Sequence, residues 1–95
     1  MDVSLHPIKP SSRFIVHNLF AYYLYDMSEF MGWNPDCSGR YRVNHESLNL
    51  YWRDRGHWPY FIHVDDQLAG FFLVREYPAN RQLVDVDQFF LLRKF

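Results

Sequence analysis

The chain has 95 residues, of which 48% are hydrophobic, 20% aromatic and 22% charged. This length fits one domain, residues 1–95, and this composition excludes an intrinsically disordered chain. The formal net charge of −1 provides no electrostatic footprint for nucleic acid or for an anionic membrane. A single cysteine, Cys37, excludes an internal disulfide and fits a reducing compartment. With no signal peptide and no membrane span in the sequence, we expect a soluble cytoplasmic protein.

The first third of the chain predicts a short strand and a long helix. Apolar and polar residues alternate weakly from Val3 to Ile8, which predicts a short strand that Pro7 either restricts to a sheet edge or ends early. From Arg13 to Met31 apolar residues recur every three or four positions, which predicts a helix ended by Gly32. Its expected buried stripe comprises Phe14, Ile15, Leu19, Tyr22, Tyr23, Met27, Phe30 and Met31.

The rest of the chain predicts a second helix and three strands. The helix covers Asn44 to Arg53, and the strands cover Pro59 to Asp65, Leu68 to Tyr77 and Leu83 to Lys94. The last strand changes phase near Asp87-Gln88, which predicts a β-bulge. The fold class is therefore α+β: a short N-terminal strand, two helices, and a three-strand antiparallel meander with the helices packed on one sheet face.

The last two strands carry more apolar surface than two helices can cover. Their apolar runs are Phe71 to Val74 and Phe89 to Leu92, and about half of these side chains must point away from the helices. Leaving four of these side chains exposed to water would cost about 6–12 kcal/mol of hydrophobic stabilisation, which is comparable with the whole free energy of unfolding of a typical domain. We therefore expect a covering partner, most simply a second copy of the chain in a two-fold dimer, or another protein. The predicted interface residues are Phe71, Leu73, Phe89, Phe90, Leu91, Leu92 and Phe95.

Four stretches of the sequence resemble a known family. They are Ala21 to Phe30, Gly39 to Arg42 with Leu50 to Trp52, Pro59 to Phe71, and Phe89 to Phe95. The third holds a hydrophobic strand, the turn Asp65-Asp66-Gln67 and then Leu68-Ala69-Gly70-Phe71. Together they resemble the N-terminal half of a predicted acetyltransferase of the GNAT superfamily, and the resemblance covers almost the whole chain.

The resemblance implies an incomplete donor site. In the family, the strand equivalent to Leu83–Lys94 is followed by a glycine-rich loop whose amides hold the pyrophosphate of acetyl-CoA at a helix N-terminus. The present sequence stops at Phe95, before such a loop, so we expect a truncated GNAT-like half-domain. The family also implies that backbone groups of Leu91, Leu92 and Arg93 would bind the pantetheine arm. We expect no cofactor for this chain by itself; acetyl-CoA would bind only if a second chain completed the site.

Catalytic and metal-binding candidates are few. Asp85 and Asp87 lie on the strand where the family sometimes places a general base, which would need a raised pKa and a nearby amine. The simpler interpretation is a solvated pair on the open face of the sheet. His57 and His63 have no cysteine or carboxylate at zinc-ligand spacing, and Cys37 is isolated. The sequence therefore predicts no metal site.

Two functional hypotheses follow, with one alternative that assigns no function. The first is a non-catalytic GNAT-like module that acts as a homodimer or binds another protein. The second is an acyl-CoA-binding or N-acetyltransferase protein whose site a second chain completes. The remaining alternative is a truncated gene product without a function of its own.

Overall fold

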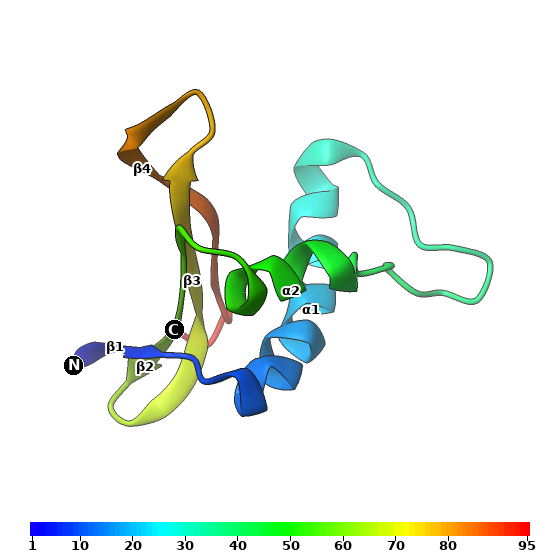
Figure 1. The fold of residues 1–95 in the computed structure, drawn as a ribbon. Helices are drawn as coiled ribbons and strands as arrows, with labels where there is room; N and C mark the ends of the chain where they lie inside the picture. The colour runs from blue at the N-terminus through cyan, green and yellow to red at the C-terminus, as the bar shows by residue number, and fades with distance from the viewer.

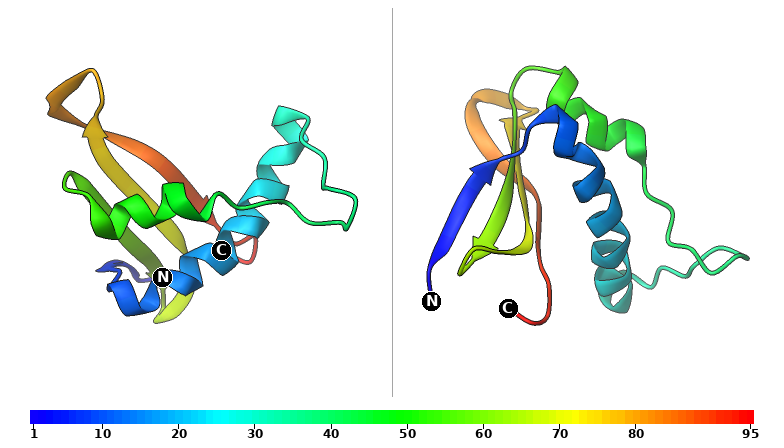
Figure 2. Two further views of the ribbon diagram at one scale, coloured as in Figure 1. Left: turned by 45° about the vertical axis from the view of Figure 1, so that its right-hand side comes forward. Right: turned by 90° about the horizontal axis from the view of Figure 1, so that it is seen from below.

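The computed structural model describes residues 1–95 and confirms the α+β fold class. Four antiparallel strands form one sheet in the order β1-β2-β3-β4, and α1 and α2 lie together on one side of it (Figures 1 and 2). Neither helix is long and apolar enough to cross a membrane. The elements are β1 Val3–Pro7, a 3₁₀ turn Pro10–Ser12, α1 Arg13–Met31, α2 His45–Arg53, β2 His57–Val64, β3 Gln67–Tyr77 and β4 Asn80–Leu91.

Local sequence signals account for how the helices and the first strand end. Gly32 ends α1 with a φ of 73°, and its N–H donates to the carbonyl of Ser28 at 2.9 Å. The side chain of Asn44 accepts from the N–H of Ser47 at 3.1 Å and caps α2. Pro7 ends β1, which is an edge strand as predicted.

The β2–β3 hairpin turns through two residues. Asp65 and Asp66 have φ values of 50° and 65°, and Val64 lies opposite Gln67 in the register. Positive φ at both central positions fits the right-handed twist of the flanking strands, and aspartate tolerates this conformation. The predicted hairpin is confirmed.

The predicted bulge in β4 is also confirmed. Leu73 pairs with Gln88 and Val74 pairs with Val86, so Asp87 is the extra residue. The bounds of this strand were predicted three residues too late at each end: β4 begins at Asn80, directly after a short turn, and ends at Leu91. The chain then folds back in a turn in which the N–H of Phe95 donates to the carbonyl of Leu92 at 3.0 Å.

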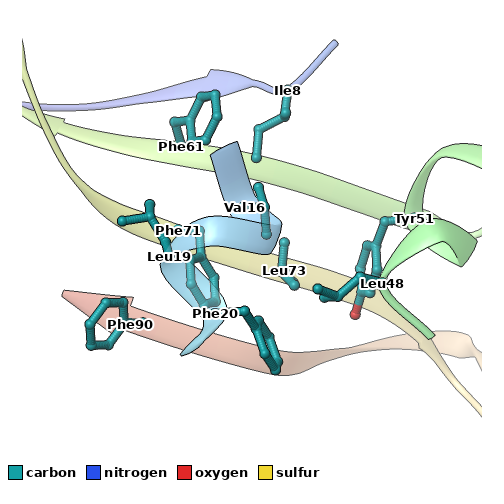
Figure 3. Close-up of a cluster of buried hydrophobic side chains, with 10 residues drawn as sticks. All are labelled: Ile8, Val16, Leu19, Phe20, Leu48, Tyr51, Phe61, Phe71, Leu73 and Phe90. Atoms are coloured by element: carbon teal, nitrogen blue, oxygen red, sulfur yellow. The ribbon is translucent and has the colours of Figure 1, made fainter. Parts of the chain in front are cut away.

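The core lies between the helices and the inner face of the sheet (Figure 3). Val16, Leu19 and Phe20 of α1 pack there, while the predicted stripe members Phe14 and Tyr22 are exposed. The predicted stripe was therefore right in part: Leu19 is buried and Ile15 and Tyr23 pack against the core, but Phe30 and Met31 are exposed as well. The helix α1 is apolar around most of its circumference, so periodicity alone does not select the buried face. The buried core residues are Ile8, Val16, Leu19, Phe20, Leu48, Tyr51, Phe61, Phe71, Leu73 and Phe90.

Candidate functional site

The outer face of the sheet has no element over it (Figure 2, right panel). Its side chains surround a hollow of about 340 Å³ whose lining is entirely hydrophobic. Every strand contributes, because residues paired across an antiparallel sheet point to the same face. We call this set the open face: Met1, Val3, Leu5, Ile62, Val64, Phe72, Phe89, Leu91 and Phe95.

The apolar surface continues toward the other end of the sheet. Trp58, Tyr60, Val74 and Val84 line a second hydrophobic hollow there. Val86, opposite Val74 in the register, is half exposed as well. A contiguous apolar patch that extends over most of a sheet face often marks an interaction site.

The structure divides the predicted interface residues between the two faces. Phe89, Leu91 and Phe95 lie on the open face. Phe71, Leu73 and Phe90 are buried among the helices, and Leu92 packs against the same core. For these four residues the predicted position at the interface was wrong. Phe71 pairs with Phe90 and both side chains point toward the helices, whereas Phe72 pairs with Phe89 and both point away from them. The sequence reasoning missed six members of the open face: Met1, Val3, Leu5, Ile62, Val64 and Phe72.

A polar cluster lies at the bulge, on the helix side of the sheet. The hydroxyl of Tyr51 donates to Oδ2 of Asp87, and Arg75 Nη2 lies 3.6 Å from Oδ1 of the same carboxylate. The hydroxyl of Tyr23 donates to the Gln88 side chain. Asp87 is therefore half-buried under α2, on the side of the sheet that the helices cover. This corrects the interpretation of Asp85 and Asp87 as a solvated pair on the face without helices. Asp85 lies opposite Arg75 in the register, on the same side.

The phenols of this cluster are held in their neutral, donating form. Burial first, and then the hydrogen bond to Asp87, raise the pKa of Tyr51 far above its usual value. Burial and the charge of Asp87 also raise the pKa of Tyr23. Donors that stay protonated fix the bulged residues Asp87 and Gln88 against the two helices. The cluster therefore ties the middle of β4 to α1 and α2.

The predicted donor-site residues occupy three different environments. The N–H of Leu92 donates to the carbonyl of Ala69 at 2.7 Å, so it is used within the sheet. Because backbone groups alternate in direction along an antiparallel strand, those of Leu91 point to the free edge of β4. The Arg93 side chain pairs with Asp26 at 2.9 Å, which raises the pKa of Arg93 through that hydrogen bond.

The histidines pair in a way that sequence spacing did not indicate. His57 packs its ring edge-on against Tyr51, while His63 lies 4.4 Å from the ring of His6. His17 of α1 and His45 of α2 meet ring to ring, 28 positions apart in the sequence. No group of three or more histidine, cysteine or acidic side chains converges as a metal site.

Comparison with known proteins identifies the fold. No protein-family model and no curated protein sequence matches the chain. Among solved structures, a ribosomal-protein-alanine N-acetyltransferase from Brucella melitensis biovar Abortus 2308 matches with a TM-score of 0.50 and 17% identity. The chain has a GNAT-like fold. The alignment covers 100% of this chain and 61% of that enzyme, so this chain spans less than two thirds of it. At this identity the likeness establishes the fold alone.

Proposed function

We propose that the chain is a non-catalytic GNAT-like binding module that pairs with a second copy of itself through the open face. The observation that carries the proposal is a hollow lined by nine hydrophobic side chains on an otherwise uncovered sheet. Phe89 and Leu5 are 50% and 51% exposed there, and water contact with such side chains is costly. Docking a second apolar face removes that cost.

The size of the face suits an interface. Four strands about 4.8 Å apart and about eight residues long span roughly 500 Å² in projection. A standard protein interface buries about 800 Å² of accessible surface on each partner. The apolar area is therefore of the right order for a stable complex, and it is comparable with the largest apolar patches of soluble proteins, which often mark interaction sites.

The apolar character of the open face favours a second copy as the occupant. A two-fold arrangement places the open face against an identical hydrophobic face, so that neither chain has to bury an unpaired polar group. Charges of both signs lie at each end of the sheet, with Asp65, Asp66 and Lys94 near the β2–β3 turn and Glu76 and Arg81 near the β3–β4 turn. The apolar face would therefore supply most of the affinity.

The non-catalytic part of the proposal rests on the residues present. Glycines occur only at positions 32, 39, 56 and 70, so these 95 residues contain no Gly-x-Gly phosphate loop. Asp87, a candidate general base, is engaged by Tyr51 and Arg75. A base occupied by two partners is poorly placed to accept a proton from a substrate amine.

Sedimentation equilibrium tests the dimer. We expect a dimer at micromolar concentration, and we expect Phe89→Lys or Leu5→Lys to raise the dissociation constant at least about 100-fold, because each buries a charge in an apolar interface. Phe14→Lys is the matched control, since Phe14 is 59% exposed but lies at the start of α1, away from the open face. A monomeric wild type, or equal weakening by all three variants, would contradict the proposal.

A second candidate is an acyl-CoA site that another chain completes. The observations that favour it are the fold likeness to an N-acetyltransferase and the free backbone of Leu91 at the β4 edge. Calorimetric titration of the dimer with acetyl-CoA tests it, and this candidate predicts saturable heat that Phe89→Lys abolishes by separating the chains. Absence of heat at millimolar acetyl-CoA would rule it out and leave the binding module.

A further inference from the structure

Two helices bring one pair of histidine rings into direct contact. His17 lies in the second turn of α1, and His45 is the first residue of α2. Their Nδ1 atoms face each other within hydrogen-bonding distance, and the rings are nearly parallel, with centroids 4.7 Å apart. His45 is exposed and His17 is half-buried, so solvent reaches the pair from one side.

Asn49 fixes the tautomer of His17. Its Oδ1 lies 3.2 Å from Nε2 of His17 and is an acceptor, so this ring nitrogen carries the proton. The Nδ1 atom of a neutral His17 then presents a lone pair toward His45. A hydrogen bond that orients the second ring nitrogen of a histidine in this way is the usual support of a metal-binding imidazole.

We propose that His17 and His45 form a two-histidine site for a divalent late-transition metal ion such as Ni²⁺, Cu²⁺ or Zn²⁺. These ions prefer neutral imidazole nitrogen, whereas Mg²⁺ and Ca²⁺ prefer oxygen. Binding requires the proton on Nδ1 of His45 to move through solvent to its Nε2. The exposed His45 ring must also turn slightly to admit the ion. Water would fill the remaining coordination positions.

The surroundings of His17 disfavour its protonated form, which would compete with a metal ion. Burial is the main cause that lowers the pKa of His17, and the neighbouring His45 lowers it further. The Arg13 cation acts in the same direction, while the hydrogen bond with Asn49 raises the pKa. The Trp52 ring lies against His17, with centroids 6.5 Å apart. An imidazole that resists protonation competes well for a metal ion near neutral pH.

Thermal unfolding with Ni²⁺ as the probe tests the site. At pH 7.5 we expect 1 mM NiCl₂ to raise the Tm of the wild-type protein by at least about 4 °C, because ligands that bind the folded state stabilise it. The shift should disappear in His45→Gln, which removes one ligand from an exposed position. It should also shrink at pH 5.5, where protons compete for the imidazoles.

His63→Gln is the matched control. His63 and His6 are the other histidine pair, but their rings are tilted by 47° and Nε2 of His6 bonds to the Ser4 hydroxyl. This variant should keep the full Ni²⁺ shift. No shift in the wild type, a shift that persists in His45→Gln, or one that disappears in His63→Gln would overturn the proposal.

Discussion

Phe71→Ala is expected to destabilise the protein by about 3–5 kcal/mol, whereas Phe72→Ala should cost the isolated chain only about 1 kcal/mol. The two side chains are neighbours on β3 and point to opposite faces. Phe71 is 0% exposed and packs against Phe20, Tyr23 and Phe90. Phe72 is half-buried on the open face, where Phe89 lies against it.

The size of the first effect follows from the position of Phe71 in the core. Its ring centroid lies 5.5 Å from that of Phe20 and 5.6 Å from that of Phe90, so it joins α1 to β4 through β3. Truncation removes the transfer free energy of the ring and leaves a cavity that rigid neighbours do not fill. For a domain of this length, the loss is comparable with the total free energy of unfolding.

Urea denaturation at several protein concentrations separates the two variants. Phe71→Ala should lower the midpoint equally at all concentrations, because the loss lies within one chain. The effect of Phe72→Ala should grow as concentration rises, because it weakens the interface that stabilises the wild type by mass action. Equal and concentration-independent losses would show that both faces of β3 are covered within a single chain.

Much of the fold was predictable from local signals. The bounds of α1, the cap of α2, the Asp65-Asp66 turn and the bulge at Asp87 depend on residues close together in the sequence. Glycine, asparagine and aspartate carry that information through their backbone and capping preferences. The edge position of β1 followed likewise from Pro7.

The assignment of faces was not predictable in the same way. Phe71 to Val74 are all apolar, so alternation gives no sign of which side the helices take. The bulge then shifts the phase of β4, which places Phe90 inward and Phe89 outward. Much of the predicted interface was therefore assigned to the wrong side, although the existence of an uncovered apolar face was expected.

The side-chain clusters depend on tertiary packing alone. Tyr51 meets Asp87 across 36 positions, and His17 meets His45 across 28. Each contact requires the crossing of α2 over the sheet or over α1, which no local motif specifies. Asp87 could be named from the sequence, but its partners could not, because they come from α2 and β3.

Gly70→Ala is the second change with a large expected effect. A Cβ atom at Gly70 would lie 1.8 Å from the carbonyl oxygen of Phe90 and 3.0 Å from the Cα of Leu91. Both are backbone atoms, so no side-chain rotation relieves the clash. The end of β4 must move away from β3, which breaks the hydrogen bond from Leu92 to Ala69. We expect a loss of about 3 kcal/mol or more.

Gly32→Ala provides the matched control for this loss. Gly32 has a φ of 73°, and a Cβ atom there would have no neighbour within 4 Å, so alanine meets only backbone strain of about 1–2 kcal/mol. Chemical denaturation of both variants measures the difference. Hydrogen exchange at Leu92 should accelerate in Gly70→Ala and not in Gly32→Ala.

Since Leu91 and Phe95 flank that amide on the open face, displacement of β4 should also weaken the dimer. A Gly70→Ala protein as stable as Gly32→Ala would mean that β4 is not held closely against β3.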